Sequence, residues 1–189
     1  MSCVIVIGGG PAGSTAATML ARQGHHVALL ERERFPRDHI GESLLPASIP
    51  ILEMLGVREA MEQAGFLKKW GATMVWGSGP DPWSWYFRET NRSYPHSYQV
   101  WRPAFDQLLL DNSRRHGVEV REGHRAVEVL FESGRAAAVR HTSDDGADRV
   151  EPADFVIDAS GQTALLGRAL DLRRWDPFFR NMAVYGYFT

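Results

Sequence analysis

A glycine-rich stretch near the start of the chain has the residue types and spacing that predict phosphate binding. Residues 8–13 read Gly-Gly-Gly-Pro-Ala-Gly and match the pattern G-x-G-x-x-G. In this pattern Gly8 permits a tight turn, Gly10 lets a pyrophosphate approach the backbone, and Gly13 lets the following helix pack closely on the preceding strand. The free N–H groups of that helix favour an anion. We expect a dinucleotide to contact Gly8, Gly10, Pro11, Ala12 and Gly13.

Two later stretches have residues suited to the same ligand. Glu31 follows Gly8 by 23 residues and ends an apolar run, where a carboxylate can accept hydrogen bonds from a ribose. Residues 155–161, Phe-Val-Ile-Asp-Ala-Ser-Gly, read as a buried strand and a turn. Asp158 and Gly161 of this turn could bring backbone close to a phosphate a second time. An ordinary turn capped by Asp158 or Ser160 is the alternative.

The elements around the glycine motif form one strand–helix–strand unit. Val4–Ile7 is a β-branched run typical of a buried parallel strand, and Val27–Leu30 is a second one. Between them, Pro11–Gln23 has small and apolar residues at helical spacing, with Gly24 placed to cap the helix. The motif therefore lies between a strand and a helix, which strengthens the prediction.

The rest of the chain predicts a doubly wound α/β core with a β-sheet insertion that begins near Gly71. We expect helices at 46–55, 59–63 and 103–116. We expect strands at 73–76, 83–87, 97–101, 118–120, 127–131, 136–140 and 155–157, with a hairpin turn at 132–134. Residues 183–188 read as a strand that stops at Thr189, which indicates a fragment of a longer protein.

Composition excludes several classes of function. The 189 residues are 44% apolar and 23% charged with a net charge of −2, as in ordinary globular proteins, so nucleic acid and anionic membrane are not expected partners. Cys3 is the only cysteine, which rules out an intrachain disulfide or a cysteine-based zinc site, and we assign no metal ligands. The first apolar run is too short for a signal peptide or a membrane span. We expect a cytoplasmic protein.

Five stretches resemble the flavin-dependent halogenases, a family within the FAD monooxygenase-like proteins. VIVIGGGPAGSTAA and FVIDASG are similar to the whole flavoprotein group. FPRDHIGESLLP, GFLKKWGATMVWG and LLGRALDLRRWDP are similar to the halogenases that act on phenolic, pyrrolic or aliphatic substrates. The resemblance implies a Rossmann-like FAD-binding core with a β-sheet insertion, of which this chain is the N-terminal part. It also implies residues 71–102 and 175–189 as part of a substrate-domain sheet.

The resemblance implies roles for two polar regions outside the glycine motif. Gly41, Glu42 and Ser43 are expected beside the isoalloxazine of FAD. Read from the residues alone, this triplet is a capping turn with Ser43 as the N-cap of the helix that contains Pro46. Arg102 matches an arginine that approaches the flavin, and a plain surface arginine is the alternative.

Lys69 matches the catalytic lysine of the halogenases, in the spacing K-x-G within KKWGA. The resemblance implies that reduced FAD, oxygen and chloride or bromide yield hypohalous acid, which Lys69 holds and delivers to an electron-rich carbon. A lysine suits this role because its ammonium donates hydrogen bonds. Read from the residues alone, Lys68 and Lys69 are a solvated pair.

The sequence thus predicts an FAD-dependent halogenase of secondary metabolism. A flavin reductase is the implied partner, since no separate NAD(P)H motif is found, and the substrate is a small molecule, free or tethered to a carrier protein. An FAD-dependent hydroxylase or flavin-dependent reductase of the same fold, and an inactive FAD-binding fragment, are the alternatives. The family's W-x-W-x-I-P motif and second FAD motif are expected beyond Thr189.

Overall fold

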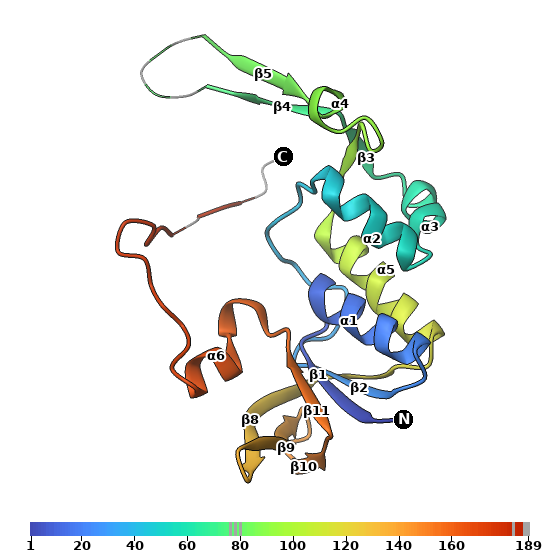
Figure 1. Ribbon diagram of the computed structural model, residues 1–189, viewed down its shortest axis with the longest axis vertical. Coiled ribbons are helices and arrows are strands. Elements are labelled where there is room, and N and C mark those ends of the chain that lie inside the picture. The colour runs from blue at the N-terminus through green and yellow to red at the C-terminus, as the bar shows by residue number, and fades with distance from the viewer. Residues whose placement is uncertain (76, 78, 80, 183, 187–189) are drawn as a thin grey trace.

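A four-stranded parallel sheet forms the centre of the protein (Figure 1). The computed structural model describes residues 1–189 except 76, 78, 80, 183 and 187–189. The strand order is β11-β1-β2-β7. Its strands are β1 (Cys3–Ile7), β2 (His26–Glu31), β7 (Glu119–Glu122) and β11 (Phe155–Asp158). This parallel sheet confirms the predicted α/β core. The doubly wound arrangement was wrong, because helices cover one face of the sheet and an antiparallel sheet covers the other. The strand order sets the end of β11 beside the end of β1, with Ile7 paired to Asp158.

Two helices cover one face of this sheet. They are α1 (Pro11–Arg22) and α5 (Arg102–Arg115), close to the predicted helices at 11–23 and 103–116. Val6 and Leu29 from the strands pack against Ala17 of α1 and Leu110 of α5, and all four are buried. The two helices also share a buried hydrogen bond between Thr18 Oγ1 and Ser113 Oγ, 3.0 Å apart.

A three-stranded antiparallel sheet packs on the other face (Figure 1). It consists of β8 (His124–Glu132), β9 (Arg135–Ser143) and β10 (Asp148–Pro152). Ile5 and Leu30 of the parallel sheet contact Val129 and Val139 of this layer. The turn between β8 and β9 has Ser133 at φ 50° and Gly134 at φ 79°, which confirms the predicted hairpin.

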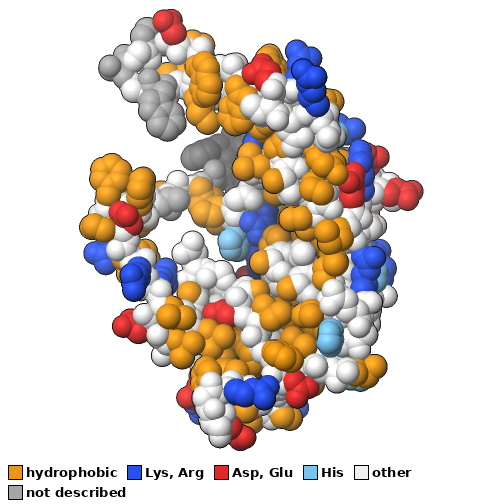
Figure 2. Space-filling view, in the orientation of Figure 1, with side chains coloured by type: hydrophobic (Ala, Val, Ile, Leu, Met, Phe, Trp, Pro, Cys, Tyr) orange, Lys and Arg blue, Asp and Glu red, His pale blue; other side chains and the backbone are white. Residues whose placement is uncertain are grey.

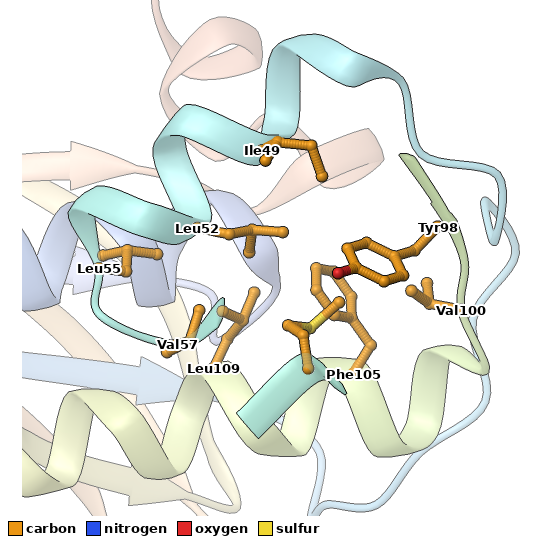
Figure 3. Close-up of a cluster of buried hydrophobic side chains, with 9 residues drawn as sticks. Ile49, Leu52, Leu55, Val57, Tyr98, Val100, Phe105 and Leu109 are labelled. Carbon is orange, nitrogen blue, oxygen red and sulfur yellow. The ribbon is translucent and has the colours of Figure 1, made fainter. Parts of the chain in front are cut away.

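A second hydrophobic core lies between α5 and two short helices, α2 (Ile49–Met54) and α3 (Arg58–Gln63) (Figure 3). The side chains labelled there are Ile49, Leu52, Leu55, Val57, Tyr98, Val100, Phe105 and Leu109. This core supports β6 (Ser97–Gln99), which pairs antiparallel with β3 (Leu67–Lys69).

The predicted insertion near Gly71 is an antiparallel hairpin of β4 (Gly71–Met74) and β5 (Trp83–Tyr86). It projects from the body of the molecule and is followed by α4 (Phe87–Thr90) (Figure 1). A Cβ at Gly71 would lie 2.3 Å from the carbonyl oxygen of Trp85, so the hairpin needs glycine at its base. The predicted strand at 73–76 ends at Met74, and its last residue lies outside the described residues.

The structure differs from the sequence-based prediction in four elements and at the C-terminus. The elements not predicted are β3, β10, α4 and α6 (Leu165–Ala169). Each has five residues or fewer, too few to establish a hydrophobic period. The expected strand at 183–188 is absent from its described part, 184–186, and the rest lies outside the described residues.

The surface exposes hydrophobic side chains in several places (Figure 2). Ile51 and Met54 on α2 are exposed, and so are Trp175, Phe178 and Phe179 in the segment after α6. None of the helices among the described residues is long and apolar enough to cross a membrane.

Candidate functional site

A cavity of about 570 Å³ opens at the carboxyl ends of β1 and β2. We call it the strand-end cavity. Its walls are the glycine motif, the end of β2, the start of β8 and residues 159–161 after β11. Ligands of open α/β sheets bind at this edge, where strand order reverses. The size also suits an organic ligand.

The glycine motif has the geometry that its spacing predicts. Gly8 has φ +103°, and a Cβ there would lie 2.4 Å from the carbonyl oxygen of Ala159. A Cβ at Gly13 would lie 1.8 Å from the carbonyl oxygen of Gly8, so α1 could not pack where it does with any side chain at this position. Gly10 is the N-cap of α1, and Pro11 is its first residue. The tight turn and the close helix–strand contact are therefore both present.

Glu31 holds the glycine motif in place. Its side chain is buried, and Oε2 accepts a hydrogen bond of 2.6 Å from the backbone N–H of Gly9. Oε1 accepts a second one of 2.8 Å from the N–H of Glu33. A carboxylate has about four acceptor positions, so the residue also retains capacity for a ligand in the cavity that it lines.

Arg37 also lines the strand-end cavity, although the sequence analysis did not single it out. Its guanidinium lies 4.6 Å from the ring centroid of Phe35, and its Nη1 is 3.3 Å from Asp106 Oδ2. A Cβ on Gly10 would be only 3.5 Å from its Nη2. Nη1 is buried, and although it forms this ion pair, it has no hydrogen-bond partner among the described residues. The Arg37 cation therefore lies beside the N-terminus of α1. In the sequence, Arg37 was one residue of the charged run at 31–38, and no local pattern set it apart.

Arg102 ties α5 to the loop that contains Gly41, Glu42 and Ser43. It is 7% exposed, which corrects the surface-arginine alternative. Its Nε and Nη2 bond the two carboxylate oxygens of Asp106 at 2.7 and 2.8 Å. Its Nη1 donates to the carbonyl oxygens of Ile40 at 2.5 Å and Gly41 at 3.3 Å. Arg102 thus both lines the cavity and fixes the loop.

The loop itself continues the small sheet of β3 and β6. The N–H of Leu44 donates to Tyr98 O at 3.0 Å, and the N–H of Val100 donates to Glu42 O at 2.8 Å. The expectation that Ser43 caps the helix at Pro46 is wrong. The N-cap there is Leu45, and no side chain caps it, because Ser43 lies in the extended stretch that pairs with β6.

Lys69 points at this loop. Its Nζ donates to Ser43 Oγ at 2.5 Å and to the carbonyl oxygen of Leu44 at 3.3 Å, and it lies 5.3 Å from the ring centroid of Phe87. Lys68, one residue earlier, is exposed. The two lysines are therefore not a uniformly solvated pair. Neither Lys69 nor Gly41, Glu42 and Ser43 line the strand-end cavity. Arg102, which does line it, donates to Gly41 of the loop that Lys69 contacts.

The turn after β11 has the capping contacts of one alternative, and its approach to a phosphate stays a prediction. Asp158 accepts from the N–H groups of Ser160 at 3.0 Å and Leu166 at 2.8 Å, and Ser160 Oγ accepts from Leu165 at 3.1 Å. These are capping contacts. Gly161, at φ +60°, nevertheless lines the strand-end cavity, whereas Asp158 does not. Asp158 thus shapes the turn that approaches the cavity.

Two histidines, one at the start of β8 and one in β9, are in contact, and the sequence analysis did not identify them. His124 lines the cavity, and its Nδ1 is 3.1 Å from Nδ1 of His141. His141 is 1% exposed. Burial, and then the neighbouring His124, lower the pKa of His141, so the uncharged form of His141 is favoured. In the described part of the chain no three His, Cys, Asp or Glu side chains are grouped to hold a metal ion.

Three comparisons with known proteins agree on a flavoprotein. The chain is 41% identical over 186 residues to a tryptophan 2-halogenase of Chondromyces crocatus, covering 97% of this chain and 35% of that protein. It is 37% identical to a 1H-pyrrole-2-carbonyl-[peptidyl-carrier protein] chlorinase of Pseudomonas fluorescens, covering 98% of this chain and 45% of that protein. The solved structure of the myxobacterial chondrochloren halogenase CndH superposes with a TM-score of 0.81 at 50% identity, covering 86% of this chain and 38% of CndH.

The chain thus spans less than half the length of these relatives. The family model described as "FAD binding domain" matches residues 1–180. That match includes the glycine motif, Glu31, the loop at 41–43 and the turn after β11. The chain belongs to the FAD-binding domain family.

Proposed function

We propose that this chain binds FAD in the strand-end cavity and supplies Lys69 to an FAD-dependent halogenation. The observation that supports this best is the contact of Lys69 Nζ with Ser43 Oγ, on a loop that Arg102 connects to the cavity. The named relatives give the reaction class. In balanced form, a substrate C–H, a halide, a proton, oxygen and reduced FAD give C–halogen, oxidised FAD and two waters.

The residues present fit FAD. The pyrophosphate would lie at the N-terminus of α1, against the backbone of Gly10, with the guanidinium of Arg37 beside it. Glu31 would accept from the ribose, and Gly161 would bring backbone to the cofactor from the other side. Gly41, Glu42, Ser43 and Arg102 would lie at the isoalloxazine end. When bound and reduced, FAD would supply two of the four electrons that reduce oxygen to water, and the halide would supply the other two as it is oxidised.

Lys69 then performs the step that belongs to this chain. Its ammonium donates a hydrogen bond to hypohalous acid and holds it toward one carbon of the substrate. The Phe87 ring lies 5.3 Å from Nζ and keeps water from one side of it. An electron-rich carbon attacks the halogen and the O–halogen bond breaks. The carbon then loses its proton as the C–H bond breaks, and the released hydroxide takes up a proton and leaves as water.

The substrate and the electron donor are part of the same proposal. Two relatives are named for tryptophan and for a pyrrole group on a peptidyl carrier protein, so an electron-rich small molecule, free or carrier-tethered, is the proposed substrate class. A flavin reductase is the proposed source of reduced FAD.

Replacement of Lys69 tests the proposed role directly. In the protein that contains this chain, Lys69→Ala should reduce halogenated product about 100-fold or more, because a positioned donor is lost. Oxygen uptake by reduced FAD should persist, because Lys69 does not line the strand-end cavity. Lys68→Ala is the matched control and should be mild, since this side chain is exposed.

The assay measures halogenated product and oxygen uptake with a reductase, NADH, FAD and chloride or bromide. Product formation by Lys69→Ala at the wild-type rate, or a loss of oxygen uptake in that variant, would refute the role. Hydroxylated product that forms without halide would instead support a hydroxylase of the same fold. Neither product with FAD bound would support an inactive FAD-binding protein.

A further inference from the structure

Ser43 and Lys69 lie on one face of a small three-stranded arrangement. Residues 42–44 run beside β6 on one side, and β3 runs beside it on the other. Lys69 pairs with Ser97, and Ser43 pairs with Gln99. Directly paired residues project to the same face, and residues two apart in a strand share a face. The contact between Lys69 and Ser43 therefore follows from strand register.

The position of Ser43 is fixed by contacts on both sides of it. The backbone of Leu44 bonds to Tyr98 of β6, that of Glu42 bonds to Val100 just after β6, and Gly41 accepts from Arg102. Lysine loses several rotors of freedom when its ammonium is held in one place. The hydroxyl of Ser43 and the carbonyl of Leu44 together give Nζ two acceptors on a fixed backbone.

We propose that Ser43 is a positioning residue for Lys69, and that its hydroxyl connects the lysine to the loop at the cofactor cavity. This inference rests on the proposed function. Ser43 acts through Lys69 rather than on the substrate. Any shift of the loop at Gly41 is transmitted to the lysine, because only one residue separates Gly41 from Ser43, whose hydroxyl holds Nζ.

Ser97 provides a matched control. It is paired directly with Lys69 on the same face, but its Oγ is fully buried and has no hydrogen-bond partner among the described residues. Ser97→Ala removes the same atom as Ser43→Ala without removing a contact to Lys69. Ser43→Thr keeps a hydroxyl, and Ser43 is exposed, so the additional methyl group has room.

Amine labelling tests the contact without any halogenation. The two lysines of this chain are Lys68 and Lys69, so an isotopic acylating reagent and mass spectrometry can report each one separately. Ser43→Ala should raise the labelling rate of Lys69 roughly 2- to 5-fold, the range for one exposed hydrogen bond to a charged group. Lys68 should label at an unchanged rate. Ser97→Ala and Ser43→Thr should leave Lys69 close to wild type.

Halogenation gives the second readout. Ser43→Ala should give several-fold less halogenated product per oxygen consumed, with the missing oxidised halide recovered by an added scavenger. Ser43→Thr should restore the yield. An unchanged labelling rate and product yield in Ser43→Ala would overturn the inference. If Lys69→Ala still halogenates, the proposed function fails, whatever the labelling result.

Discussion

Replacing Glu31 by glutamine should destabilise the glycine motif as well as weaken FAD binding. Glu31→Gln keeps the shape of the side chain but replaces one carboxylate oxygen by an amide NH₂. Because the two oxygens accept from the N–H groups of Gly9 and Glu33, one N–H must then face another donor. The side chain is 5% exposed, so water cannot replace the missing acceptor.

The size of the effect follows from the bonds that are lost. A hydrogen bond to a charged group contributes about 1.5–3 kcal/mol, and a buried unpaired donor costs about 1–3 kcal/mol. With one neutral bond retained, Glu31→Gln should lower the free energy of unfolding by about 2–4 kcal/mol. FAD affinity should fall about tenfold or more, because the backbone N–H groups of the motif lose their fixed position.

Urea unfolding followed by circular dichroism measures the first quantity, and titration by flavin fluorescence measures the second. Glu33→Gln is the control for unfolding, because its carboxylate is 42% exposed and its ion pair with the exposed Arg32 is worth under about 1 kcal/mol. If Glu31→Gln unfolds within about 0.5 kcal/mol of the control and binds FAD equally well, the bracing role of Glu31 is refuted.

Three further predictions concern the same cavity. Gly13→Ala should abolish FAD binding and lower the free energy of unfolding by several kcal/mol, because its Cβ would lie 1.8 Å from Gly8 O. Gly10→Ala should cost less in urea unfolding, because its Cβ would meet only the end of the Arg37 side chain. Arg37→Met should weaken FAD binding about tenfold and reduce its dependence on salt, as measured by titration at two ionic strengths. The pKa of His141 is lowered in the folded state, so the unfolded state binds the proton first as the pH falls. The free energy of unfolding should therefore decrease as the pH drops below about 6.5. Its dependence on pH, measured by urea unfolding, should be weaker in His141→Leu.

Local signals predicted the core well. The β-branched runs, the glycine spacing and Gly24 each act within one element, and β1, α1 and β2 lie where they were expected. The α5 helix was equally predictable from the sequence, because Pro103 marks its start and Gly117 its end. Each of these signals comes from the conformational preference of the residue type itself.

The site was less predictable because its contacts join distant segments. Lys69 meets Ser43 across 26 residues, and Arg37 meets Asp106 across a longer span. Neither contact has a local pattern, since each depends on how strands and helices pair. The Ser43 capping prediction failed for the same reason: a local rule suggested a cap, but pairing with β6 took the residue into an extended stretch.

The close approach of Gly8 to Ala159 has a consequence for how the protein acquires its cofactor. The glycine motif is synthesised first, yet one wall of its cavity comes from residues 159–161, about 150 positions later. A growing chain therefore displays the motif long before the cavity can close around FAD. The large sequence separation between the two walls makes this closure slow compared with the formation of α1. We therefore expect FAD to bind only after β11 has emerged from the ribosome. On this order of events FAD binds a partly folded chain and does not assist the folding of the first strand–helix–strand unit.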